Sequence, residues 1–103
     1  MADPMKIRAS LVGDSTEVKV LMNHEMETGQ RKDAQGAVIP AGFIQSVTVT
    51  YGGKTVLAAQ WGPAVAKNPF LSFKFKGGAK GEKVTITWVD NRGDKRTDEA
   101  TIA

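Results

Sequence analysis

The sequence predicts an all-β fold, an antiparallel immunoglobulin-like β-sandwich of about seven or eight strands. Short segments in which apolar and polar residues alternate recur along the chain, which is the period of a half-buried strand. Glycine, proline and other turn residues separate these segments, and no segment has a helical period. The 103 residues suffice for one hydrophobic core, so we expect a single domain over residues 1–103. A closed barrel is the alternative.

The first two strands are expected at residues 5–12 and 16–22. "MKIRASLV" alternates apolar with polar residues, and "TEVKVLM" places Val18, Val20 and Met22 on one face. The intervening "GDS" is typical of a turn, so the two segments should pair antiparallel. From residue 23 to residue 36 the alternation stops, which predicts a long loop or an irregular hairpin.

The middle of the chain predicts a hairpin followed by a second irregular connection. "IQSVTVTY" at 44–51 is rich in β-branched residues, and "KTVLAAQW" at 54–61 follows the glycine pair at 52 and 53. Two glycines between two strands predict a two-residue hairpin turn. "GPAVAKNP" at 62–69 is interrupted by glycine and proline, which predicts an irregular loop.

Three further strands complete the predicted sandwich. "FLSFKFK" at 70–76 and "EKVTITWVD" at 82–90 alternate clearly, whereas "KRTDEATI" at 95–102 is more polar and is expected at a sheet edge. Trp88 is expected in the core. The chain has no cysteine, so it cannot have the Cys-Trp-Cys pattern of antibody domains.

Composition excludes several classes of function. No apolar segment is long enough to cross a bilayer, and "MADPMKIRAS" lacks the apolar region of a secretory signal. The net charge of +3 comes from 14 basic residues scattered among 11 acidic ones, so we expect neither nucleic-acid nor membrane binding. By itself, the chain is expected to be cytoplasmic or already processed.

His24, the only histidine, raises the possibility of a metal site. A thioether beside an imidazole suits copper, so a stand-alone periplasmic small-ligand or copper-binding sandwich using Met22, His24 and Met26 is the alternative function. Catalysis by histidine would need a nucleophile and an orienting acid, and no serine lies in a nucleophile-elbow sequence. We therefore predict a structural or interface role for His24, no enzymatic activity and no cofactor.

Carboxylates are a second class of candidate catalytic groups. Most lie in predicted turns or on edge strands, where solvated surface charge is the expected role. The candidates are Glu25, Glu27, Asp90, Asp94, Asp98 and Glu99.

The second loop is unusually apolar. It carries Trp61, Pro63, Val65 and Pro69 and leads into Phe70. Large apolar residues in a loop are either packed into the core or offered to a partner, and tryptophan is favoured at binding hot spots. Two elaborate loops on a plain sandwich favour binding over catalysis.

Three stretches of the chain together resemble the SoxZ family of the bacterial sulfur-oxidation (Sox) system. They are "HEMETGQRKDAQGAVIPAGFIQSVTV", "WGPAVAKNPFLSFKFKGGAKGE" and "WVDNRGD", and the likeness runs from about Met5 to Ile102. The family often has "HPMETG" and "IPAHFI" where this chain has Glu25 and Gly42. The second difference removes a possible second histidine, which weakens the copper interpretation further.

The resemblance implies a non-catalytic subunit that forms a heterodimer, or a higher oligomer, with SoxY. SoxY carries the sulfur intermediate on a cysteine arm, and other Sox enzymes would contact the pair transiently. It also implies a periplasmic location reached by co-export with a signal-bearing partner. The residues predicted to contribute to partner surfaces are His24, Met26, Arg31, Lys32, Trp61, Pro63, Lys67, Asn68, Pro69 and Phe70.

Overall fold

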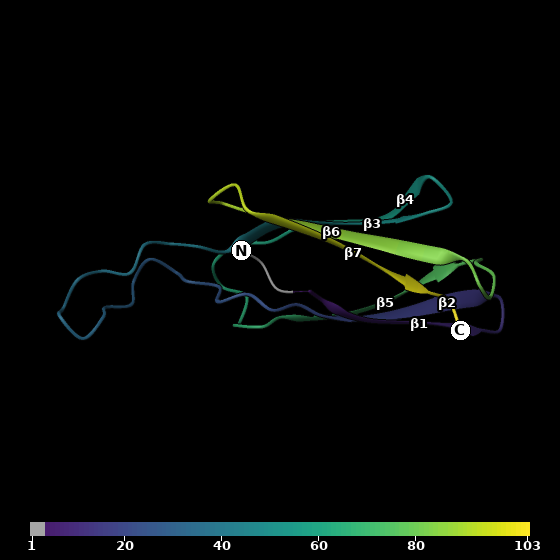
Figure 1. The fold of residues 1–103 in the computed structure, drawn as a ribbon, viewed down its shortest axis with the longest axis horizontal. Helices are drawn as coiled ribbons and strands as arrows, with labels where there is room; N and C mark the ends of the chain where they lie inside the picture. Colours follow the sequence, from purple (N-terminus) through teal and green to yellow (C-terminus); the bar gives the residue numbers. More distant parts are fainter. Residues whose placement is uncertain (1–3) are drawn as a thin grey trace.

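Seven antiparallel strands form the computed structural model, which describes residues 4–103 (Figure 1). The strands are β1 (Lys6–Val12), β2 (Ser15–Leu21), β3 (Ile44–Tyr51), β4 (Lys54–Gln60), β5 (Phe70–Lys76), β6 (Lys83–Asp90) and β7 (Lys95–Thr101). Among residues 4–103, no helix has the length and apolar character needed to cross a bilayer.

The strands form two sheets packed face to face, which confirms the predicted sandwich over the barrel. One sheet has the order β1-β2-β5 and the other has the order β4-β3-β6-β7. The polar strand β7 lies at an edge, as predicted. The predicted hairpin between β3 and β4 is also confirmed, because Gly52 and Gly53 have φ angles of 59° and 77°, which a type I′ turn requires.

The core lies between the sheets and is built from the apolar face of each strand. Val18 and Val20 of β2 and Val47 and Val49 of β3 are fully buried in this core, and Trp88 of β6 lies in it beside His24, at the end nearest the long loops. Met22, predicted to end the second strand, lies just beyond β2 but is fully buried. The period-two pattern therefore identified the buried face correctly in both sheets.

The two sides of the sandwich are closed to different extents. Beside β1 and β7, the amide of Ala103 donates to the carbonyl of Ala9 at 2.9 Å, and Leu11 N–H donates to Ala103 at 3.0 Å. On the other side, no hydrogen-bonded ladder joins β4 to β5 within residues 4–103. The inward-facing Phe73 and Phe75 of β5 are consequently only half-buried.

Residues 27–42 form an irregular hairpin, which we call the arm; of the two predicted alternatives, the hairpin is correct. Backbone hydrogen bonds join Glu27 to Gly42 in both directions at 2.7 and 3.0 Å, and Ile39 N–H donates to Arg31 at 2.8 Å. At the tip, the carboxylate of Asp33 accepts hydrogen bonds from two backbone amides. The arm projects beyond the end of both sheets (Figure 1).

We predict that Asp98→Asn destabilises the protein at neutral pH but not in strong acid. The Asp98 carboxylate accepts from Arg96 at 2.9 and 2.8 Å and from the Met5 amide at 3.0 Å. The hydrogen bonds from Arg96 hold the pKa of Asp98 below its ordinary value. Its contribution is therefore complete above the unfolded-state pKa and is lost as the pH falls through the lower folded-state value.

Urea unfolding at several pH values measures this effect. We expect Asp98→Asn to lower the free energy of unfolding by about 1 kcal/mol at pH 7, with the difference from wild type shrinking as the pH falls through the lowered folded-state pKa of Asp98. Glu99→Gln is the control, because the Glu99 carboxylate is half-exposed beside Lys83. A pH-independent loss in Asp98→Asn would contradict the prediction.

Candidate functional site

The two long loops meet at the end of the sandwich from which the arm projects. The His24 amide donates to the Asn68 side chain at 3.1 Å, and the Asn68 amide returns a hydrogen bond to the His24 carbonyl at 2.9 Å. The Met22 amide donates to the Pro69 carbonyl at 3.0 Å, a distance typical of a backbone hydrogen bond. These bonds hold the segment after β2 against the segment before β5.

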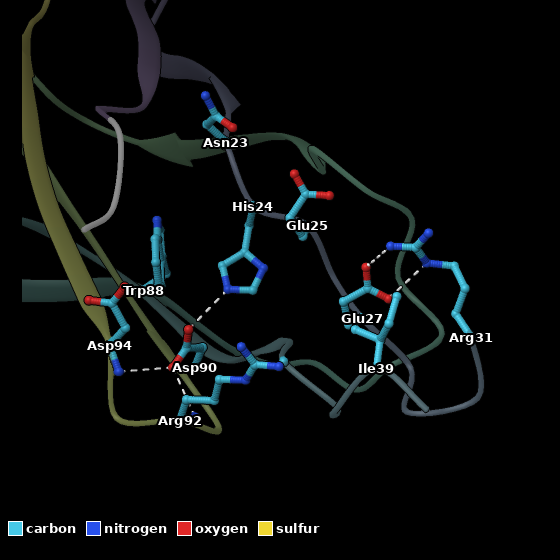
Figure 2. A pocket seen from close by; sticks show the side chains of 11 residues that line it. Asn23, His24, Glu25, Glu27, Arg31, Ile39, Trp88, Asp90, Arg92 and Asp94 are labelled. Carbon is cyan, nitrogen blue, oxygen red and sulfur yellow. Dashed lines mark hydrogen bonds and ion pairs between the residues drawn. The ribbon is translucent and has the colours of Figure 1, made fainter. Parts of the chain in front are cut away.

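His24 links this loop to the end of β6 (Figure 2). Its Nδ1 accepts a hydrogen bond from the Met26 amide at 3.0 Å, so the ring proton lies on Nε2. Nε2 then donates to Asp90 Oδ2 at 3.1 Å. The two side chains are only 10% and 6% exposed, so the contact is a buried structural bond.

Asp90 also organises the turn between β6 and β7. Its Oδ1 accepts from the amides of Arg92 and Asp94, both at 2.9 Å. One carboxylate thus satisfies three donors from two separate segments, which explains how it is tolerated when buried.

Two further contacts fix the position of the His24 ring. It meets the ring of Trp88 edge-on, with centroids 5.0 Å apart and an interplanar angle of 87°. Met26 adopts a left-handed φ of 53°, buries its side chain and accepts the Ile44 amide on its sulfur at 3.4 Å. A non-glycine residue in this region is strained, so the surrounding packing has to hold it there.

The turn after β6 clamps the base of the arm. The Asn91 side chain accepts from the Phe43 amide at 2.8 Å and donates to the Ala41 carbonyl at 3.1 Å. The Arg92 guanidinium donates to the carbonyls of Pro40 at 2.6 Å and Ala41 at 3.1 Å. Gly42 permits this approach, because a Cβ there would lie 2.7 Å from Arg92 Nε.

An ion pair within the arm stiffens the strand that leaves the sandwich. Arg31 donates to both carboxylate oxygens of Glu27, a bidentate contact, with Nε at 3.1 Å. The hydrogen bonds from Arg31 hold the pKa of Glu27 below its ordinary value. Beyond Arg31, every residue up to Val38 is exposed.

A hollow of about 770 Å³ lies between the arm and the β6–β7 turn (Figure 2). Its polar side chains are bonded to other protein groups: His24 to Asp90, Glu27 to Arg31, and Arg92 to backbone carbonyls. Glu25 at its rim pairs with Lys67 at 3.3 Å. The hollow therefore presents no free base beside a nucleophile, which acid–base catalysis requires.

The same geometry argues against the copper interpretation. Both ring nitrogens of His24 are occupied by hydrogen bonds, and the sulfur of Met26 is directed at the Ile44 amide. Met22 is fully buried. In residues 4–103, no three histidine, cysteine, aspartate or glutamate side chains are grouped as metal ligands would be.

The predicted partner-surface residues separate into three groups. Arg31, Lys32, Pro63, Lys67 and Asn68 are exposed around the arm and the second loop. His24, Met26, Trp61 and Pro69 lie beneath that surface and hold it in place. Phe70 is 61% exposed but starts β5, where it faces outward on the smaller sheet.

Sequence reasoning missed the residues that organise this end of the molecule. The expectation of solvated charge is wrong for Asp90, which is buried, and for Asp98, which is nearly so. No role is predicted from the sequence for Asn91 and Arg92, which lie between the strands expected at 82–90 and 95–102. A carboxylate at a strand end followed by "NRGD" was the available signal, because Asp favours such turn-capping positions.

Comparison with known proteins identifies a family that matches nearly the whole chain. A model of the family described as "Sulphur oxidation protein SoxZ" matches residues 5–101. A comparison with curated proteins finds no match.

Two solved structures share the fold. A superoxide reductase in its oxidised state has a TM-score of 0.65 at 16% identity, covering 99% of this chain and 89% of that one. The superoxide reductase (neelaredoxin) of Archaeoglobus fulgidus has a TM-score of 0.61 at 20% identity, covering 97% and 86%. At these identities the likeness extends to the fold alone.

We predict that Asp90→Asn weakens the His24 contact while leaving the turn intact. The amide oxygen can still accept from the Arg92 and Asp94 backbone, but the new NH₂ group would face the Nε2 proton of His24. We expect the free energy of unfolding to fall by about 1–3 kcal/mol in a urea titration. Asp94→Asn is the control, since the exposed Asp94 carboxylate bonds the neighbouring Lys95 amide. Equal losses in both variants would contradict the prediction.

Proposed function

Because the chain belongs to the SoxZ family of sulphur oxidation proteins, we propose that it pairs with a SoxY-like carrier subunit and presents it to other Sox enzymes. Family membership assigns it a non-catalytic role in sulphur oxidation, within a system that operates in the periplasm. The proposal adds the partner and the surface that binds it.

The amino-acid composition supports a division of labour between two chains. A covalent sulfur carrier needs a nucleophilic thiol, and this chain has no cysteine. The sulfur intermediate must therefore be carried by another chain. A SoxZ-family subunit would stabilise that carrier and supply surface for its recognition.

The arm is the observation on which the proposed surface rests. Its exposed outer half stands clear of the sandwich and carries Val38, an apolar side chain that is 56% exposed. A projecting hairpin has two accessible faces and can insert beside a partner domain. Exposed apolar residues on such an element favour protein binding over a solvated surface.

The clamps at its base make the arm suitable for stable association. Asn91 and Arg92 fix its returning strand, and the Glu27–Arg31 pair fixes its outgoing strand. A recognition element held in one conformation loses less entropy on binding. The neighbouring second loop extends the surface, because a hollow of about 510 Å³ is lined by Thr28 and Arg31 of the arm and by Pro63 and Lys67 of the loop.

In this proposal, the periplasmic location of the chain depends on its pairing with the carrier subunit. The Sox system, to which the SoxZ family belongs, operates in the periplasm. The chain would then reach the periplasm folded against a carrier that bears the export signal.

We predict that Val38→Glu weakens association with the SoxY-like subunit. A carboxylate at this position would have to be desolvated in the interface, so we expect the affinity to fall at least about tenfold. Isothermal titration of the two purified subunits measures it. Val12→Glu is the matched control, because Val12 is 50% exposed and lies at the end of β1 farther from the arm. Equal affinities for wild type and Val38→Glu would remove the arm from the interface, whereas no binding by wild type would refute the pairing.

We also predict that export of this chain depends on the partner. Deleting the signal region of the co-expressed SoxY-like subunit should leave this chain in the cytoplasmic fraction, as measured by fractionation and immunoblotting. Deleting the signal of an unrelated exported protein is the control. Periplasmic accumulation without the partner's signal would contradict co-export.

A further inference from the structure

The outer face of the smaller sheet concentrates positive charge. Alternation along β1, β2 and β5 directs every second side chain away from the core. Within these three strands, the outward charged residues are Lys6, Arg8, Glu17, Lys19, Lys74 and Lys76. Five are basic and one is acidic, so the face carries a charge of +4.

This concentration is not evident from the overall charge. The whole chain carries only +3, so everything outside this face sums to about −1. The basic residues are scattered in the sequence, and strand pairing gathers them onto one surface. We call this surface the basic face.

Strand register places like charges opposite each other on the basic face. Arg8 of β1 pairs directly with Lys19 of β2, an arrangement that destabilises a sheet by a few tenths of a kilocalorie in general. Glu17 compensates Lys19 at 3.5 Å and Lys74 at 3.9 Å. It leaves Lys6, Arg8 and Lys76 without a carboxylate partner among the ion pairs of residues 4–103.

One end of the basic face is apolar. Leu21 of β2 and Phe70 of β5 are direct partners in the ladder, and both are exposed, Phe70 to 61%. A hollow of about 450 Å³ is lined by these two side chains together with Lys6, Arg8 and Lys19. Apolar surface and uncompensated cations are therefore contiguous.

We propose that the basic face is a docking site for an acidic protein surface that bears a protruding apolar side chain. The acidic groups would meet Lys6, Arg8 and Lys19, and the apolar group would enter beside Leu21 and Phe70. Permanent interfaces are depleted in lysine, so this face suits a transient partner that is steered by charge. The site is separate from the arm and does not depend on pairing through it.

Other anionic partners fit the face less well. Single-stranded nucleic acid would require several aromatic side chains for stacking, and the face has only Phe70. A bilayer would favour apolar anchors across the face, whereas here only Val12 is apolar at the end opposite Leu21 and Phe70, and Glu17 pairs with two lysines between them. A protein surface can match both the carboxylate and the cations.

Binding of a short synthetic peptide, one leucine flanked by glutamates, to the full chain tests the proposal. We expect amide NMR shifts to change over β1, β2 and β5, and binding to weaken as salt rises from about 50 to about 300 mM. Arg8→Gln should weaken binding about threefold or more. The same variant should raise the melting temperature, because it removes the repulsion with Lys19.

Because Arg8→Gln should weaken binding while it raises the melting temperature, misfolding could not be the cause of its weaker binding. Lys95→Gln, on the outer face of the larger sheet, is the control and should bind like wild type. Phe70→Ser should weaken binding without changing its salt dependence. Shift changes confined to the arm, or tighter binding to phosphatidylglycerol vesicles than to the peptide, would overturn the proposal.

Discussion

The hydrogen bond from His24 to Asp90 is the contact on which the arm-bearing end of the molecule depends. It joins the segment after β2 to the last residue of β6, across the edge of Trp88. The same carboxylate closes the β6–β7 turn, and that turn supplies Asn91 and Arg92 to the base of the arm. The buried carboxylate of Asp90, at the end of β6, thus determines the position of the arm.

This arrangement separates rigidity from exposure. The buried contacts at this end are made by His24, Met26 and Asp90, which are nearly inaccessible, whereas the outer half of the arm is exposed. Because the clamping bonds are formed within the chain, a partner would not need to order the base of the arm when it binds. Met26 and Asn68, both with left-handed φ angles, flank His24 and show where the chain accepts strain to make these turns.

The sequence was sufficient to predict most of the fold because strand formation depends on local patterns. Alternation located the seven strands, and the glycine pair at 52 and 53 identified the β3–β4 turn. The His24–Asp90 contact joins residues 66 positions apart, and nothing local distinguishes such a histidine from a solvated one. The basic face could not be predicted for a related reason. Arg8 and Lys19 become neighbours only through the register in which β1 pairs with β2.

Histidine suits the position at residue 24 for a reason unconnected with catalysis. The site needs an acceptor for the Met26 amide, a donor for the Asp90 carboxylate and a flat apolar edge against Trp88. A neutral imidazole supplies all three, because its two nitrogens have opposite roles and are held at a fixed separation. Asparagine and glutamine offer a donor and an acceptor but no ring, and aromatic residues offer a ring without the acceptor. A lone histidine in a chain without cysteine is therefore better explained by hydrogen-bond geometry than by metal binding or proton transfer.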